Sequence, residues 1–141
     1  MIPVNGEVLM KNRLLLPLLG LTLALLVVSA PLPAHHGKGA FDMDKLTVVK
    51  GIVMKFEFIN PHTLIYVDAI GDKGNVEHWI AESSSNNHLG RGGYDKNSLK
   101  PGEQVIVSGH RAKNGVNSLE LQCQECSVTD LQGKVLLGYY F

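Results

Sequence analysis

Apolar and polar residues alternate with a period of two over most of the chain beyond residue 45. This alternation is typical of β-strands with one buried face. Turn residues divide it into five segments, 46–58, 63–69, 76–82, 104–112 and 118–129, and residues 135–140 are a sixth candidate. In the first segment we expect the even-numbered apolar residues to share one face: Leu46, Val48, Ile52, Met54, Phe56 and Phe58. Gly51 predicts a bend or bulge in that strand.

The connections between these segments predict the fold. Asn60–Pro61 and residues 71–75, 98–102 and 113–115 are turn sequences. Residues 83–93 are polar and glycine-rich, and we expect one or two helical turns there. Three strands, a short helical insert and two more strands is the order of an OB-type barrel. We therefore predict an all-β, OB-like barrel of five to six strands; a flat β-sandwich fragment is the alternative.

The N-terminal 34 residues have the pattern of a secretory signal peptide. Lys11 and Arg13 precede an apolar run over residues 14–28, and the small residues Ala30 and Ala34 follow it. The run is shorter than the roughly 20 residues that a membrane-spanning helix needs, so an uncleaved anchor is the weaker alternative. We predict a signal peptide over 1–34, with Met10 as the true start. We then expect a single domain over 35–141 that is periplasmic or secreted.

The charge of the remaining chain excludes one class of partner. Of the 13 basic and 13 acidic side chains, two basic and one acidic belong to residues 1–34, which leaves a formal charge of −1. Nucleic-acid binding requires a basic surface that neutralises phosphates. We therefore expect no nucleic-acid partner, and contact with the membrane only through the signal peptide during export.

Cys123 and Cys126 are the two cysteines of the chain. In an oxidising compartment such a pair is more often a disulfide than a metal site. The apolar alternation changes phase between the two residues, which predicts a β-bulge at Gln124–Glu125. A bulge would bring both sulfurs to one face, within disulfide reach. We favour a structural disulfide; free or metal-binding thiols and a redox pair are the alternatives.

His35 and His36 directly follow the expected cleavage site. Cleavage after Ala34 would allow the new α-amine and the His35 ring to chelate one metal ion. Cleavage one residue earlier would place a histidine third from a free amine, an arrangement that gives a square plane of nitrogens. Nitrogen-rich tetragonal sites favour Cu(II). We therefore expect a transition metal, copper first, at this pair; two solvated histidines near a terminus are the alternative.

Five polar residues near two expected turns form a second candidate site. In the barrel that we predict, the turns at 60–61 and 113–115 meet at one rim, with the end of the third strand beside them. We expect this rim to gather a ligand-binding set: Asn60, His62, Glu82, His110 and Arg111. Imidazoles, a carboxylate and a fixed cation suit an anion or a metal. The alternative is structural: His62 caps its turn and Glu82 pairs with Arg111.

The chain also resembles a family of small exported bacterial proteins that is known only as a domain of unknown function. The resemblance covers about residues 35–138, and the motifs that carry it are His35-His36-Gly37, Phe41-Asp42, Lys50-Gly51, Asn60-Pro61-His62, Trp79 with Glu82, Ser98-Leu99-Lys100-Pro101-Gly102 and Gly109-His110-Arg111-Ala112-Lys113-Asn114-Gly115. Family members usually have serine where this chain has Gly37, and proline where it has Ser85. The cysteine pair is not part of the pattern. The resemblance implies export and a single β-domain, with no established activity.

Three functional hypotheses follow. The first is a periplasmic module that binds a transition metal through His35 and His36. The second is a metal-free OB-like module that binds a small anionic ligand or a partner protein at the rim around Arg111. The third and weakest is an enzyme, because a His–Glu pair could transfer protons but no nucleophile with a positioned base accompanies it.

Overall fold

The fold was determined as a computed structural model, which describes residues 38–139. The expected signal peptide and the pair His35 and His36 lie outside the described residues. Within them, the elements are η1 (Lys38–Ala40), β1 (Phe41–Glu57), β2 (Leu64–Ile70), β3 (Val76–Glu82), α2 (Asn86–Arg91), β4 (Gln104–Ala112), β5 (Ser118–Glu120), β6 (Ser127–Thr129) and β7 (Val135–Gly138). No helix in this described part is long and apolar enough to span a membrane.

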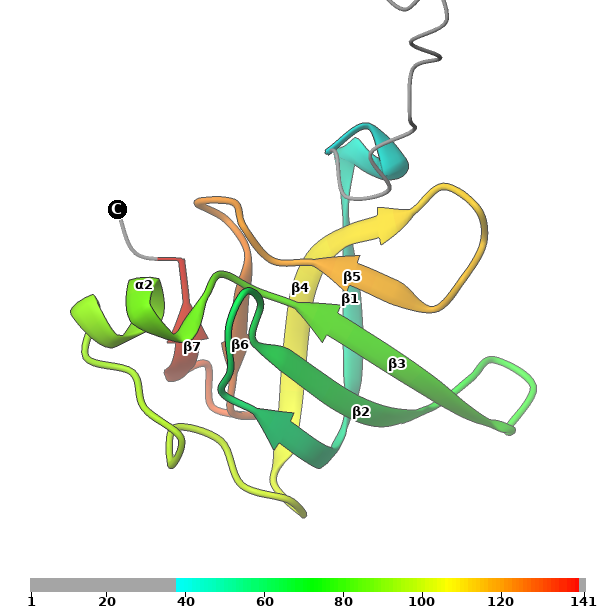
Figure 1. Ribbon diagram of the computed structural model, residues 1–141. Coiled ribbons are helices and arrows are strands. Elements are labelled where there is room, and N and C mark those ends of the chain that lie inside the picture. The colour runs from blue at the N-terminus through cyan, green and yellow to red at the C-terminus, as the bar shows by residue number, and fades with distance from the viewer. Residues whose placement is uncertain (1–37, 140–141) are drawn as a thin grey trace, which may run out of the picture. The chain divides into compact units, whose positions relative to one another are not determined.

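Five strands form a closed barrel (Figure 1). They are ordered β1-β2-β3-β5-β4, and β4 pairs back with β1, while β6 and β7 extend the sheet beyond β4. The pairing of β3 with β5 is parallel, and the remaining pairings are antiparallel. The strand order, with α2 between β3 and β4, confirms the OB-like barrel and its helical insert.

The long strand β1 closes the barrel by pairing with two partners. Its first part pairs with β4 and its second part with β2, and Gly51 pairs with both strands, opposite Ala69 and Val105. A Cβ at Gly51 would collide with the carbonyl oxygen of Asp68. The glycine is therefore required by close backbone approach at the closing point.

A bulge in β1 changes which residues face the core. The register with β2 shifts between Val53 and Lys55. Before the shift the odd-numbered Val49 and Val53 are buried, while Val48 and Met54 are 63% and 53% exposed. The expectation that the even-numbered apolar residues share one face is therefore wrong. Past the bulge the even residues Phe56 and Phe58 pack against the core, because an extra residue reverses the alternation.

The expected fifth strand is also corrected. Residues 118–129 do not form one bulged strand but two short ones, β5 and β6, each paired with a different part of β4. The chain turns between them, where the Cys126 N–H donates to the Cys123 carbonyl over 3.1 Å. A disulfide joins Cys123 and Cys126, whose Cα atoms are 5.1 Å apart. The disulfide is confirmed, but a turn rather than a bulge brings the sulfurs together.

Buried apolar residues from all sides of the barrel form its core. They include alternate positions of β2 and β4, such as Ile65, Val67, Val105 and Val107. Trp79 of β3 is 6% exposed and belongs to this core. Leu89 of α2 and Leu99, which lies between α2 and β4, pack into the same cluster. This rigid barrel positions the side chains at its ends and on its outer faces.

Candidate functional site

The side chains of His62 and Glu82 contact each other beside the turn between β1 and β2. The His62 Nδ1 lies 3.0 Å from Glu82 Oε1, and both side chains are partly exposed. Asn60 belongs to the same turn, where its peptide bond with Pro61 is cis and its side chain is exposed. The structure thus brings His62 and Glu82 together, and the expected alternative pairing of Glu82 with Arg111 is wrong.

The expected set of five residues does not meet at one rim, and strand direction explains this. The antiparallel pairing of β2 with β3 places the turn at 58–63 at the end of β3, next to Glu82. The strand β5 runs parallel to β3, so the turn that precedes β5 lies further back along β3. The turn at 113–117 precedes β5 and lies beside the middle of β3, where the Ile80 N–H donates to the Asn117 carbonyl. His110 and Arg111 are consecutive residues of β4 and therefore point to opposite faces. They belong to two different sites.

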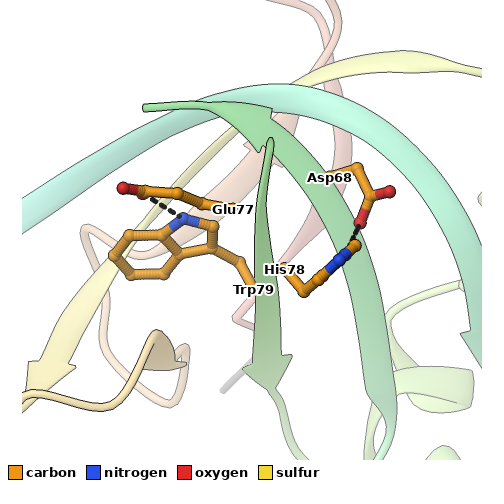
Figure 2. Close-up of polar contacts among 4 residues, drawn as sticks. All are labelled: Asp68, Glu77, His78 and Trp79. Atoms are coloured by element: carbon orange, nitrogen blue, oxygen red, sulfur yellow. Dashed lines mark hydrogen bonds and ion pairs between the residues drawn. The ribbon is translucent and has the colours of Figure 1, made fainter. Parts of the chain in front are cut away.

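Arg111 stacks on Trp79 inside one end of the barrel. The guanidinium carbon lies 4.9 Å from the centre of the Trp79 ring, and Nη2 donates to Asn117 Oδ1 over 2.9 Å and weakly to the Gly115 carbonyl. The indole N–H of Trp79 donates to Glu77, whose side chain lies on the same side of β3 (Figure 2). Among the described residues the buried Nε of Arg111 has no hydrogen-bond partner. Arg111 is therefore held in place with a donor still unused.

A hollow of about 690 Å³ opens beside Arg111, and we call it the Arg111 hollow. It is lined by Asp42, Lys45, Leu46, Thr47, Val48, Arg111, Ala112, Lys113 and Gly115. Three of these residues are cationic and one is acidic, so the hollow favours anions. Arg is well suited to oxyanions, because its planar fork of N–H donors matches carboxylate and phosphate groups.

Two of the three cations were missed by sequence reasoning as ligand-binding residues. Lys45 and Lys113 are 68 positions apart and meet only because the start of β1 pairs with the end of β4, with Phe41 opposite Ala112. Lys113 is anchored here, since its Nζ donates to the Gly39 carbonyl over 3.2 Å. No local pattern joins the two lysines; the antiparallel β1–β4 pairing of an OB-type barrel is the signal that could have found them.

The outer face of β1, β2 and β3 carries a second set of polar contacts. His78 Nδ1 lies 2.6 Å from Asp68 Oδ1 on β2, on the opposite side of β3 from Trp79 (Figure 2). Two shallow hollows of about 490 and 590 Å³ on this face share Met54 and Asp68. The face also exposes Ile52 and Ile80. It is therefore an amphipathic surface rather than a charged one.

Three ionisable groups interact on this same face. The Tyr66 hydroxyl donates to Glu57 Oε2 over 2.9 Å, and Lys55 forms an ion pair with Glu57. The hydrogen bond with Lys55, followed by the one from Tyr66, lowers the pKa of Glu57. The hydrogen bond to Glu57 is also the main cause that raises the pKa of Lys55 and that of Tyr66. Each shift favours the state in which Glu57 is ionised and its two partners are protonated.

His110 lies on the outer side of β4, beside the disulfide. It is 7% exposed, and its Nδ1 contacts the carbonyl oxygens of Asp42 and Lys45 at 3.0 and 3.2 Å. One nitrogen of His110 and the sulfurs of Cys123 and Cys126 lie within 4.8 Å of one another. Among the described residues these are the ones grouped closely enough to share a metal ion, and in this structure the two sulfurs are joined to each other.

Glu120 links this cluster to the His62–Glu82 pair. In the strand register, Glu120 of β5 lies opposite Glu82 of β3 and opposite His110 of β4. The three side chains therefore share one face of the sheet. Glu120 is 6% exposed, and sequence reasoning did not select it. Its Oε1 accepts from the Gln122 N–H, while its buried Oε2 has no partner among the described residues.

Comparison with known protein families matches most of the chain. A family model described as a family of unknown function (DUF6152) matches residues 23–120. No curated protein matches the chain. The expected resemblance to an uncharacterised family is thereby confirmed. The matched residues end before the disulfide, at Glu120.

Proposed function

The chain belongs to the family of unknown function DUF6152, and we propose that it is an exported binding module that holds a small oxyanion in the Arg111 hollow. The observation that carries the proposal is Arg111 itself. Its guanidinium is fixed by Trp79 and Asn117, and its buried Nε has no partner among the described residues. An oxyanion in the hollow would lie beside this fixed guanidinium, whose planar fork of N–H donors matches carboxylate and phosphate groups.

The charges around the hollow support the same class of ligand. Lys45 and Lys113 are exposed at its edge, and Asp42 is the one acidic residue in the lining. Charge-assisted hydrogen bonds between guanidinium and oxyanions are roughly twice as strong as neutral ones. Lysines at the edge add attraction that weakens as salt screens it. We therefore expect modest, salt-dependent affinity for a group such as phosphate or carboxylate.

Tryptophan fluorescence tests this proposal, because Trp79 is the one tryptophan of the chain and it contacts Arg111. Inorganic phosphate, titrated at constant ionic strength, should change Trp79 emission to a saturating value. The double variant Lys45→Ala/Lys113→Ala keeps the reporter pair intact and should bind at least about tenfold more weakly, since bonds to charged groups contribute about 1.5–3 kcal/mol. Lys96→Ala, at an exposed position outside the hollow, is the matched control. A linear response, or equal affinity in both variants, would contradict the proposal.

A second candidate function is the binding of Cu(II) through His35 and His36. The supporting observation is their position directly after the small-residue end of the expected signal peptide. Native mass spectrometry of the exported protein, recovered without chelator, would report the cleavage point and any bound copper together. The candidate requires a chain that starts at Ala34 or His35 and takes up one copper ion. A chain that stays metal-free when copper is supplied, or copper binding that survives His35→Ala/His36→Ala, excludes it.

A further inference from the structure

We propose that reduction of the disulfide between Cys123 and Cys126 opens a binding site for a thiophilic divalent cation, Zn²⁺, with His110 as the third ligand. The site lies on the outer face of β4, on the opposite side of that strand from the Arg111 hollow. Its three ligands belong neither to the lining of the Arg111 hollow nor to the pair His35 and His36, although Asp42 and Lys45, whose carbonyls contact His110, also line the hollow. Its basis is the grouping of one imidazole nitrogen and two sulfurs within 4.8 Å.

The surroundings of His110 prepare it to be a ligand. Its Nδ1 contacts two carbonyl oxygens, those of Asp42 and Lys45, and a carbonyl oxygen can only accept. Nδ1 therefore carries the hydrogen, and the neutral ring keeps its lone pair on Nε2. The register of β1 with β4 shifts between Phe41 and Leu46, so these carbonyls lie outside the regular ladder. An N–H that donates to a backbone carbonyl is the usual support behind a metal-binding histidine.

The two sulfurs are held close by contacts other than their own bond. The Cys126 N–H donates to the Cys123 carbonyl, which closes the turn between them. Cys126 is 2% exposed and part of the core, and Cys123 packs against that core. These contacts do not depend on the disulfide, so the reduced thiols should stay near His110. Between the cysteines, Gln124 and Glu125 are exposed, which leaves the turn open to a reductant.

Charge balance favours Zn²⁺ among thiophilic ions. Two thiolates and a neutral imidazole around Zn²⁺ give a site with no net charge, whereas a monovalent ion would leave a buried negative charge, which is costly. Three protein ligands with one open position is an established zinc arrangement. The buried Oε2 of Glu120, which has no partner among the described residues, lies on the same face of the sheet as His110.

The site forms in two steps, reduction of the disulfide and then binding of the metal ion. An external dithiol reduces the protein disulfide, gives the cysteines two electrons and two protons, and becomes a disulfide itself. The two thiols then bind Zn²⁺ as thiolates and release two protons. The metal site and the disulfide exclude each other, because Zn²⁺ binds cysteine as a thiolate and a sulfur in a disulfide is no longer a thiolate. The site therefore couples metal binding to the thiol redox state.

Zinc binding by the whole exported chain tests the proposal. His35→Ala/His36→Ala is used as the background, so that the other candidate metal site does not contribute. After reduction and removal of the reductant under nitrogen, native mass spectrometry should show one Zn²⁺ per chain, and the oxidised chain should show none. X-ray absorption should find two sulfurs and at least one nitrogen around the zinc.

Two matched histidine variants separate a specific site from loose thiol binding. His110→Gln in the same background should weaken zinc binding by at least about tenfold, the lower end of the loss seen for supporting residues alone. His78→Gln, at an exposed position, should leave the affinity unchanged. If His110→Gln fails to fold, the absorption spectrum of the reduced His110-containing chain decides through its nitrogen ligand. Equal zinc uptake by oxidised and reduced chains, no uptake after reduction, or a zinc environment without nitrogen would each overturn the proposal.

Discussion

The Arg111 guanidinium carbon lies 4.9 Å from the centre of the Trp79 ring, inside one end of the barrel. Trp79 reaches this position from β3 and Arg111 from β4, two strands that are separated by β5. A cation stacked on an aromatic face keeps its edge donors available for a ligand. This pair thus joins the core of the protein to the Arg111 hollow, and several consequences can be measured.

Replacement of Arg111 should affect stability as well as ligand binding. Arg111→Ala removes the stacking on Trp79 and the bond to Asn117, and we expect the free energy of unfolding to fall by about 1–2 kcal/mol. Urea denaturation followed by Trp79 emission provides the measurement. Arg91→Ala, at an exposed position of α2, should change stability by less than about 0.5 kcal/mol. Equal stability of the two variants would show that the stacking contributes nothing.

The contact between Tyr66 and Glu57 should be visible in pH titrations. Glu57→Gln removes the main cause that raises the pKa of Tyr66, so this pKa should fall toward its ordinary value. NMR titration of the Tyr66 ring carbons measures it, with Glu103→Gln as the control. A Tyr66 pKa that is unchanged by Glu57→Gln would show that the hydrogen bond is absent in solution.

The same group of residues predicts the direction of the pH dependence of stability. Because the pKa of Glu57 is lowered by folding, its contribution is present above its unfolded pKa and is lost as the pH falls through its folded pKa. The raised pKa of Tyr66 acts in the other direction. Its contribution is present below its unfolded pKa and is lost as the pH rises through the folded one. Urea midpoints compared between wild type and Glu57→Gln should converge at both pH extremes.

Closure of the barrel should depend on Gly51. In Gly51→Ala the new methyl group would collide with the Asp68 carbonyl and lie 2.6 Å from Val67 Cγ1. We expect this variant to lose about 1–3 kcal/mol of stability, as overpacked cores do. Gly90→Ala in α2 meets nothing within 4 Å and should be neutral or stabilising by up to about 1 kcal/mol. Thermal melts of the two variants that shift in the same direction would contradict this account of Gly51.

Loss of the disulfide should cost a moderate amount of stability. The bond closes a loop of four residues, Cys123 to Cys126, and chain entropy predicts about 2 kcal/mol for that length. Cys123→Ala/Cys126→Ala should lose this amount in urea denaturation without metal, and a reductant should have no further effect on it. Wild type that keeps its full stability after reduction would show that the turn itself supplies the constraint.

The positions of strands were predictable where turn residues lie on both sides of a segment in which apolar and polar residues alternate without interruption. The bounds of β3 and β4 agree with the expected segments, because Gly-rich or Pro–Gly turns frame both of them. The core-facing side of β1 was not predictable, since the bulge at Met54 has no local signal and reverses the alternation. The split of the fifth segment was missed for a related reason. A phase change predicts either a bulge or a turn, and only the pairing partners on β4 decide between them.

The candidate site was predictable only in part. His62 and Glu82 meet because the β2–β3 register places Leu64 opposite Glu82, and a hairpin register can be read from sequence. Arg111 lies near the end of β4, but His110 could not join it in one site, because neighbours on a strand face opposite ways. Lys45 and Lys113 depend on the long-range pairing of β1 with β4, which no spacing of residues reveals.

The most direct test of oxyanion binding is an NMR titration of the ¹⁵N-labelled protein with inorganic phosphate at constant ionic strength. The side-chain Nε–H of Arg111 should shift, together with the indole N–H of Trp79 and the backbone amides that line the Arg111 hollow. The Nε–H of Arg91 and the amides around His62 should not. Shifts that are absent, or that are centred on the His62–Glu82 pair instead, would contradict the account.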